Sequence, residues 1–357
     1  MGKIRVLICD DSALMRTSLK KIVESAPDLF VVGTARDGVD AVAKARELHP
    51  DVVTMDINMP GMDGITALQV IMAENIAPVV MVSSLTQEGA QVTFEALALG
   101  AFDCVPKPGG TVSVQMGSVA NEIIIKVRAA AKAGTLARLS RGKSPAGDGG
   151  HTAPRAFLKK KRNPVSVHGF KAIAMGISTG GPKTLFEVLP FLPRDLNAAI
   201  FLVQHMPPTF TCSFAQRIDA HSPMKCVEAS VGMPVEPGTI YLGKGGSHLM
   251  VHTKADGGMI LRTPNRPEHS FIPSVDIMMS SVLEVFGSDT VGVLMTGMGD
   301  DGADSMVKIR QAGGATIAES EESAIVFGMP REAIERGGAQ IVSPSWEIAN
   351  QIIKAVK

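Results

Sequence analysis

The chain has 357 residues, and its 35 Lys and Arg residues balance 35 Asp and Glu residues, so its formal net charge is zero. This length predicts two domains, and the balanced charge argues against a nucleic-acid partner. No apolar run approaches the roughly 20 residues of a membrane span, the N-terminus has no signal-peptide pattern, and the cysteines form no C-x-x-C pair. We therefore expect a cytoplasmic protein with reduced thiols and no membrane insertion.

The first domain, residues 1–125, alternates between strand-like and helix-like segments. The predicted strands are 4–9, 30–35, 52–56, 78–83 and 103–106. The predicted helices are a stretch capped by Ser12, then 41–48, 64–73, 89–99 and 119–133. This alternation predicts a doubly wound α/β domain with a parallel sheet, in which ligands bind at the carboxyl ends of the strands.

Polar residues fall at those strand ends. Asp10 and Asp11 follow the first strand, Asp56 ends the third, Ser83 ends the fourth and Lys107 follows the fifth. Gathered carboxylates repel one another unless a cation is present, and oxygen ligands of this kind favour Mg²⁺. A lysine and a hydroxyl beside them suit a phosphoryl group. Each residue alone is more simply a strand-end polar group, but their coincidence at one sheet edge favours a site.

These motifs are similar to the receiver domain of two-component response regulators. They are Asp10-Asp11, Asp56 with the following Met59-Pro60-Gly61-Met62-Asp63-Gly64, Val82-Ser83-Ser84, and Lys107-Pro108. The resemblance implies a flavodoxin-like fold of five parallel strands, with Asp56 accepting a phosphoryl group from a histidine kinase. Ser83 and Lys107 would bind the phosphoryl oxygens. The implied Mg²⁺ contacts are Asp10, Asp11, Asp56 and the backbone carbonyl of Asn58.

Residues 126–168 are predicted to be the end of a helix followed by a flexible basic linker. Glycines and prolines between residues 134 and 154 oppose regular structure, and Asp148 is the single acidic residue from 134 to 168. The run Lys159-Lys160-Lys161-Arg162 is typical of a solvated tether. A docking segment for an acidic partner remains the alternative.

The second domain, residues 169–357, has its own strand–helix alternation. Predicted strands are 172–177, 198–203 and 290–295, with short strands and a hairpin within 231–252. Predicted helices are 210–220, 274–286, 303–312, 332–336 and 348–356. This pattern predicts an α/β domain with a mainly parallel sheet.

The turn after residues 172–177 carries a candidate nucleophile. Gly176-x-Ser178-x-Gly180 fits the pattern in which a serine sits on a sharp turn between a strand and a helix, and Pro182 could open that helix. Glycines let the turn close and let a substrate approach. A phosphate-binding turn or plain tight packing explains the same residues.

A nucleophilic serine needs a base, and the base needs an orienting group. Ser178, His205 and Asp301 all lie just past predicted strands, where residues distant in sequence can converge. His205 is favoured because it ends an apolar strand just before Pro207-Pro208, which halts the chain. The competing residues are His221, His248, His252, His269 and, as the acid, Asp300.

Five motifs of this domain resemble the catalytic domain of the chemotaxis protein-glutamate methylesterase, CheB. They are Gly176–Pro182, Val203-Gln204-His205-Met206-Pro207-Pro208, Pro273-Ser274-Val275-Asp276, Leu294–Gly302 and Val326-Phe327-Gly328-Met329-Pro330-Arg331-Glu332-Ala333-Ile334. The resemblance implies Ser178 as nucleophile, His205 as base, Asp301 as orienting acid and the Met298 N–H as an oxyanion donor. A receiver linked to this domain is the family's arrangement.

The resemblance further implies a phosphorylation-activated serine hydrolase that removes methyl groups from γ-glutamyl methyl esters of chemoreceptors in chemotaxis adaptation. The same chemistry permits deamidation of receptor glutamines. The implied partners are a chemotaxis histidine kinase and methyl-accepting chemoreceptors, with a monomeric chain, Mg²⁺ in the receiver and no cofactor for ester hydrolysis. In the family the unmodified receiver obstructs the catalytic face.

One segment departs from the family pattern, which has an Arg-containing stretch directly before Pro273. Here the residues are Glu268-His269-Ser270-Phe271-Ile272, and Phe271 and Ile272 supply no positive charge. The alternative function is a receiver fused to a non-catalytic partner-binding domain, with Ser178 in a phosphate-binding turn. A DNA-binding regulator is disfavoured because no basic recognition helix follows the linker.

Overall fold

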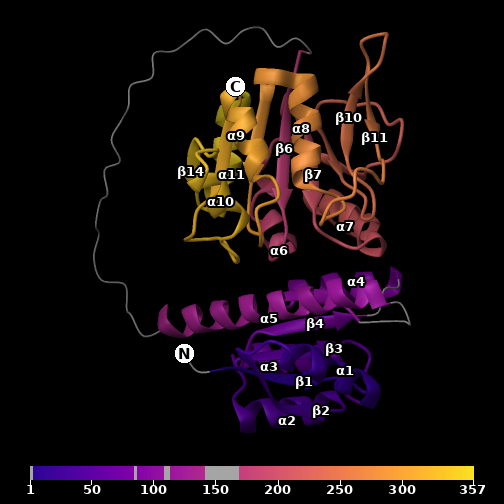
Figure 1. The fold of residues 1–357 in the computed structure, drawn as a ribbon, viewed down its shortest axis with the longest axis vertical. Coiled ribbons are helices and arrows are strands. Elements are labelled where there is room, and N and C mark those ends of the chain that lie inside the picture. Colours follow the sequence, from indigo (N-terminus) through magenta and orange to yellow (C-terminus); the bar gives the residue numbers. More distant parts are fainter. Residues whose placement is uncertain (1–2, 84–86, 108–112, 141–168) are drawn as a thin grey trace.

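The computed structural model describes residues 3–83, 87–107, 113–140 and 169–357, which form two lobes stacked end to end (Figure 1). Residues up to 140 form the N-terminal lobe and residues from 169 form the C-terminal lobe. Each lobe is built around its own sheet, so the two predicted α/β units are both present. Within the predicted segment 126–168, residues 126–140 belong to a helix, and residues 141–168 lie outside the described residues.

The N-terminal lobe alternates strands and helices along the chain. Its elements are β1 (Ile4–Cys9), α1 (Ala13–Glu24), β2 (Leu29–Ala35), α2 (Gly38–Leu48), β3 (Val52–Asp56), α3 (Gly64–Ala73), β4 (Val79–Ser83), α4 (Gln87–Ala98), β5 (Asp103–Pro106) and α5 (Ser113–Ser140). The sheet has five parallel strands in the order β2-β1-β3-β4-β5, which confirms the predicted doubly wound fold. α5 continues to Ser140 and so includes the predicted boundary at residue 125.

Local sequence explains where these helices begin. Ser12 caps α1 by accepting a hydrogen bond from the Met15 N–H, and Asp37 and Asp63 cap α2 and α3 in the same way. The central strand β3 and the second half of β1 are buried on both faces, as a parallel sheet covered by two helical layers requires, whereas the edge strand β2 is only partly buried. Capping and burial together fix the strand ends, where the polar residues lie.

The C-terminal lobe contains more short elements than the sequence predicted. Its elements are β6 (Lys171–Ile177), α6 (Gly181–Leu185), η1 (Leu189–Phe191), β7 (Ala198–Gln204), α7 (Pro208–His221), β8 (Lys225–Glu228), β9 (Thr239–Leu242), β10 (Met250–Thr253), β11 (Met259–Arg262), α8 (Val275–Phe286), η2 (Gly287–Asp289), β12 (Thr290–Leu294), α9 (Ala303–Gln311), β13 (Ala315–Glu319), α10 (Met329–Glu335), β14 (Ile341–Ser343) and α11 (Ser345–Val356).

Seven strands form the main sheet of this lobe, in the order β14-β13-β12-β6-β7-β9-β8, and their pairings are all parallel. The antiparallel hairpin β10–β11 stands apart from it. The mainly parallel sheet is therefore confirmed. β8, β13 and β14 were not predicted individually, and the hairpin extends beyond the predicted 231–252 because β11 supplies its second strand.

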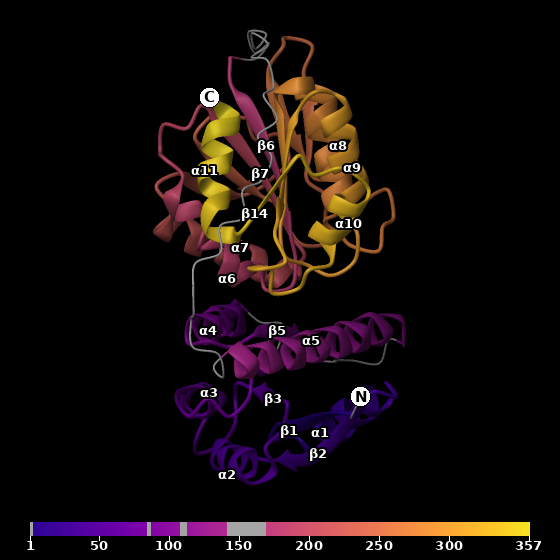
Figure 2. The same cartoon turned by 90° about the vertical axis from the view of Figure 1, so that its left-hand side faces the viewer.

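Helices cover both faces of this sheet (Figure 2). One hydrophobic cluster packs α6, α7 and α11 against one face, and a second packs α8, α9 and α10 against the other. The central strands β6 and β7 are almost wholly buried between these layers. Their carboxyl ends point toward the N-terminal lobe, whose α4 and α5 face them (Figures 1 and 2).

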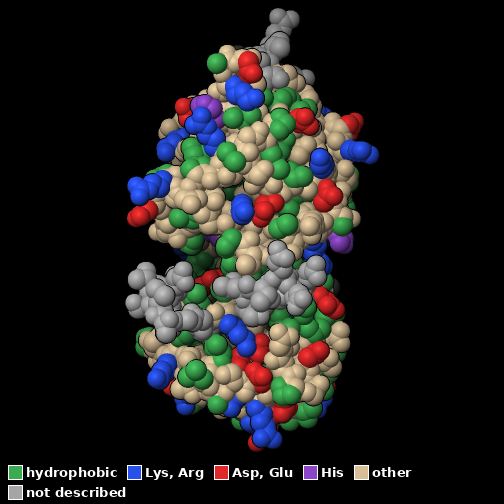
Figure 3. All heavy atoms as spheres, turned by 90° about the vertical axis from the view of Figure 1, so that its right-hand side faces the viewer, with side chains coloured by type: hydrophobic (Ala, Val, Ile, Leu, Met, Phe, Trp, Pro, Cys, Tyr) green, Lys and Arg blue, Asp and Glu red, His purple; other side chains and the backbone are tan. Residues whose placement is uncertain are grey.

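Charged side chains of both signs are interspersed over both lobes on the face drawn in Figure 3. This agrees with the zero formal net charge. Among the described residues, the helices are too short or too polar to span a bilayer. The overall charge therefore gives no indication of a partner, and the function has to reside in particular sites.

Candidate active site

Three neighbouring strands of the C-terminal sheet end where the expected triad residues lie. β12, β6 and β7 are adjacent and parallel. Ser178 directly follows β6, His205 directly follows β7, and Asp301 lies in the turn between β12 and α9. Because carboxyl ends of parallel strands share one edge, the fold brings these distant residues to the same edge of the sheet.

The turn after β6 holds Ser178 tightly. The Ser178 N–H donates to the Thr296 carbonyl at 2.9 Å, and the Gly181 N–H donates to the Ser178 carbonyl at 2.9 Å. A Cβ atom at Gly181 would lie 2.0 Å from Gln204 Oε1, so a larger residue would have to displace the Gln204 amide, which donates to the Ser178 carbonyl. The predicted strand–turn–helix is confirmed, with Pro182 in the first turn of α6.

Asp301 fixes one edge of the His205 ring. His205 Nε2 and Asp301 Oδ2 are 2.8 Å apart, and Asp301 is only 3% exposed. Oδ2 also accepts from the Val275 N–H, and Oδ1 accepts from Ser274 Oγ and the Asp276 N–H. Burial alone would raise the pKa of Asp301, but the hydrogen bonds from His205 and the backbone hold it below its usual value. An ionised carboxylate here can stabilise a protonated imidazole.

The competing residues lie in other surroundings. Asp300 is exposed and forms an ion pair with Arg336 at 2.6 Å. His248 is fully buried, with Nδ1 accepting from the Ser274 N–H and Nε2 bonded to the Pro267 carbonyl, so it holds a loop in place. The remaining competitors are exposed: His221, His252 and His269. Of the candidate acid–base pairs, the hydrogen bonds join His205 with Asp301.

The loop after β12 approaches the Ser178 turn closely. The Gly297 N–H donates to the Val326 carbonyl at 3.0 Å, and the Gly297 carbonyl accepts from the Met329 N–H at 2.8 Å. A Cβ atom at Gly297 would lie 2.2 Å from Met329 Sδ and 2.8 Å from Ser178 Cβ. Met298 follows this close approach in the chain. Its role as an oxyanion donor stays a prediction.

Glu319 is a supporting residue that the sequence analysis did not identify. It ends β13, is fully buried, and accepts the Thr296 N–H at 2.7 Å and Ser323 Oγ at 2.8 Å. Thr296 Oγ1 in turn donates to the Thr179 carbonyl at 2.9 Å, so Glu319 supports the residue that anchors the serine turn. Burial raises the pKa of Glu319 to about 7. The sequence feature that points to Glu319 is an acidic residue at the end of an apolar run.

The N-terminal lobe gathers three carboxylates at its own strand ends. Ligand oxygens of Asp10, Asp11 and Asp56 lie within 4.8 Å of one another. Asp10 and Asp56 are buried, whereas Asp11 is exposed, so one side of the group opens to solvent. A set of hard oxygen donors around one point fits Mg²⁺. The acidic pocket is therefore consistent with the predicted metal site.

Lys107 closes this pocket. Its Nζ lies 2.7 Å from Asp56 Oδ2 and 3.1 Å from Asp10 Oδ2. Burial raises the pKa of Asp56, and the nearby Asp10 adds to the rise, although the Lys107 ammonium opposes it. The Asn58 N–H reaches Asp56 Oδ1 at 3.4 Å. Ser83 ends β4 as predicted, and its side chain lies outside the described part of the structure.

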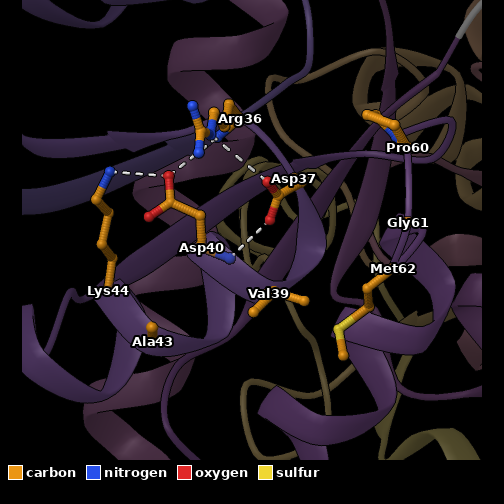
Figure 4. Close-up of a pocket in the computed structure, with 9 residues that line it drawn as sticks. All are labelled: Arg36, Asp37, Val39, Asp40, Ala43, Lys44, Pro60, Gly61 and Met62. Carbon is orange, nitrogen blue, oxygen red and sulfur yellow. Dashed lines mark hydrogen bonds and ion pairs between the residues drawn. The ribbon is translucent and has the colours of Figure 1, made fainter.

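A groove of about 700 Å³ beside α2 is a different kind of concavity (Figure 4). Asp40 Oδ2 pairs with Lys44 at 2.9 Å, Asp37 lies 3.7 Å from Arg36, and the Asp40 N–H donates to Asp37. The charged side chains that line it thus satisfy one another. Since α2 lies on the side of the lobe away from β6 and β7, this groove is remote from Ser178 (Figure 1).

The two lobes meet at the edge that carries Ser178. Phe94 of α4 enters the hydrophobic cluster of the C-terminal lobe and stacks on Phe214, with ring centroids 5.1 Å apart. Asp103 Oδ2 accepts the Gly180 N–H at 3.1 Å, and Asp103 Oδ1 pairs with the buried Lys126 at 3.1 Å. The N-terminal lobe therefore contacts the serine turn directly.

The two lobes together define a class: a response regulator whose receiver is joined to a catalytic α/β domain. Comparison with known proteins agrees. Residues 6–115 match the response regulator receiver domain, and residues 173–352 match the CheB methylesterase domain. The second match alone covers half of the chain.

Full-length relatives give the particular family. A protein of Syntrophomonas wolfei, named protein-glutamate methylesterase/protein-glutamine glutaminase 3, is 59% identical over 99% of both chains. A protein of Pyrococcus horikoshii with the same activity in its name is 43% identical over 99% of this chain and 94% of its own. The crystal structure of the Thermotoga maritima CheB methylesterase catalytic domain matches 52% of this chain and 98% of that domain, with 38% identity and a TM-score of 0.51. The chain belongs to the CheB family of protein-glutamate methylesterases/protein-glutamine glutaminases of chemotaxis adaptation.

Proposed function

We propose that Ser178 is the nucleophile, His205 the general base and Asp301 the residue that orients His205. His205 removes the hydroxyl proton of Ser178 as the oxygen attacks the ester carbonyl carbon. Asp301 stabilises the imidazolium that results. The observation that carries this proposal is the 2.8 Å contact between His205 and the buried Asp301, at the sheet edge that also carries Ser178. The lowered pKa of Asp301 favours its charged form.

The substrate is a γ-glutamyl methyl ester on a methyl-accepting chemoreceptor. The tetrahedral intermediate, stabilised by the Met298 N–H, expels the methoxide group, which takes the proton held by His205 and leaves as methanol. Water, deprotonated by His205, then attacks the acyl-Ser178 ester. The Ser178 oxygen leaves and takes back the proton from His205, and the product acid ionises to a glutamate carboxylate. With a receptor glutamine, ammonia leaves in place of methanol. Apart from this water, every group in the scheme belongs to the chain or the substrate.

Asp56 accepts a phosphoryl group from a chemotaxis histidine kinase. Ser83 and Lys107 bind the phosphoryl oxygens. The Mg²⁺ site consists of Asp10, Asp11, Asp56 and the Asn58 carbonyl, and a bound Mg²⁺ supplies positive charge against the transferred phosphoryl group. Support comes from the three carboxylates within 4.8 Å and from Lys107 at 2.7 Å from Asp56.

The unmodified receiver obstructs the serine turn, and phosphorylation loosens it. Support comes from the Asp103–Gly180 hydrogen bond, two residues from Ser178, and from Phe94 in the hydrophobic core of the catalytic domain. Lys107 directly follows β5, and β5 begins at Asp103. A phosphoryl group that moves Lys107 thus acts on the strand that holds the blocking contact. The protein works as a cytoplasmic monomer.

The test is methanol release from methylated chemoreceptors by the phosphodonor-treated chain. Ser178→Ala should abolish release and should also abolish covalent labelling by a fluorophosphonate, because both need the hydroxyl oxygen. Ser288→Ala is the matched control, since Ser288 is exposed near the amino end of β12. Full methanol release by Ser178→Ala would refute the proposed nucleophile.

A further inference from the structure

One face of the proposed base is covered by an aromatic ring. The rings of His205 and Phe271 are stacked, with centroids 4.3 Å apart and planes 6° from parallel. Phe271 comes from the loop before α8 and is 38% exposed. An exposed phenylalanine needs no explanation by itself, but a parallel stack on a histidine is a specific geometry.

The loop that carries Phe271 is held on both sides of that residue. The buried His248 bonds the Pro267 carbonyl at 2.9 Å and accepts the Ser274 N–H at 3.2 Å. The Gly246 N–H donates to the Ile272 carbonyl at 3.1 Å. These bonds anchor the backbone immediately around Phe271. The ring is thus presented to His205 by a supported backbone.

Two contacts together orient the imidazole. Asp301 holds the Nε2 edge at 2.8 Å, and Phe271 covers a face. His205 Nδ1 is buried and has no hydrogen-bond partner in the described part of the structure, so it is the ring nitrogen left for Ser178. A phenyl ring offers neither a donor nor an acceptor that could compete for the proton. Its face also attracts a cation placed over it.

We propose that Phe271 is a positioning residue of the esterase reaction, which holds the plane of His205 and stabilises the imidazolium formed when His205 takes the Ser178 proton. This rests on the proposed role of His205 as base. The attraction is stronger for imidazolium than for neutral imidazole, so it favours the transition state over the resting enzyme. A segment that departs from the family's basic pattern thereby acquires a role in the chemistry.

The test compares variants of the full-length chain treated with acetyl phosphate and Mg²⁺. Phe271→Leu keeps apolar bulk but removes the aromatic face, whereas Phe271→Tyr keeps the face. Phe191→Leu is the matched control, because Phe191 is 68% exposed in η1. We expect Phe271→Leu to lower kcat for methanol release about tenfold with KM nearly unchanged, equivalent to about 1.4 kcal/mol. For Phe271→Tyr and Phe191→Leu, kcat and KM should stay close to those of the wild-type protein.

A second measurement uses a probe that does not need receptor binding. The rate of Ser178 labelling by a fluorophosphonate should fall about tenfold in Phe271→Leu and be retained in Phe271→Tyr. An unchanged kcat and labelling rate in Phe271→Leu would overturn the positioning role, as would an equal loss in Phe271→Tyr. A rise in KM with unchanged kcat would also overturn it and would show that Phe271 contacts the substrate instead. If the unchanged chain neither hydrolyses esters nor reacts with the probe, the proposed function itself fails.

Discussion

Asp300 and Asp301 are neighbours in the chain with different surroundings. Both oxygens of Asp301 accept backbone N–H groups, from Val275 at 2.7 Å and Asp276 at 3.0 Å. Either orientation of an asparagine amide would therefore set its NH₂ group against a backbone donor. Asp300 instead faces Arg336 on the surface. Their hydrogen bonds and burial therefore distinguish Asp301 from Asp300, which the strand-end pattern of the sequence does not.

We predict that Asp301→Asn lowers kcat/KM for methanol release by on the order of 10⁴-fold, because His205 loses its orienting charge. Asp300→Asn should change it less than about threefold, as expected for an exposed ion pair. Steady-state rates with methylated receptors measure both. An essential Asp300 with a dispensable Asp301 would show that the acid is assigned one residue too late.

At the scale of elements, the end of β13 supports the end of β6 through Glu319 and Thr296. Because burial raises the pKa of Glu319 from its ordinary 4.5 to about 7, the folded state holds this proton more tightly than the unfolded state. The associated stabilisation is complete below about pH 4.5 and is lost as the pH rises through about 7.

We predict that, between about pH 5 and pH 8, the unfolding free energy of the unchanged chain falls by on the order of 2 kcal/mol more than that of Glu319→Gln. Urea unfolding followed by the fluorescence of the single tryptophan, Trp346, reports on the catalytic domain. Parallel pH dependence in the two proteins would contradict the buried titration.

At the scale of the whole molecule, any effect of Asp56 on Ser178 must cross the interface between the domains. We predict that Asp56→Asn keeps low basal methanol release but loses stimulation by acetyl phosphate with Mg²⁺, because it lacks the acceptor carboxylate. A tenfold stimulation needs only about 1.4 kcal/mol of difference between the blocked and open arrangements. Undiminished stimulation of Asp56→Asn would exclude Asp56 as the switch.

Three companion proteins locate that coupling. Asp103→Ala removes the acceptor for the Gly180 N–H and should raise basal release, whereas Asp28→Ala, on an exposed ion pair with Arg128, should not. A fragment from Phe170 onward should release methanol regardless of the phosphodonor. A folded but inactive fragment would show that the receiver contributes part of the active site.

The strands missed by the sequence analysis are short. β8, β13 and β14 have only three to five residues each, too few for a clear period. Their pairing with neighbours from distant parts of the chain makes them strands. The roles of Phe271 and Glu319 were missed for a similar reason, because their contacts with His205 and Thr296 join residues that are distant in sequence. Local sequence patterns do not predict such contacts.

By itself, the sequence determined two α/β units, the strand ends at which polar residues fall, and the candidate residues Ser178, His205, Asp301 and Asp56. Those inferences depend on local periodicity, capping and motif spacing, which neighbouring residues control. Only the tertiary structure decided that Asp301 rather than Asp300 contacts His205, that Phe271 covers the same ring, and that Asp103 reaches the serine turn. Each of these is a contact between distant segments, and side-chain packing and strand order, rather than local propensity, select it.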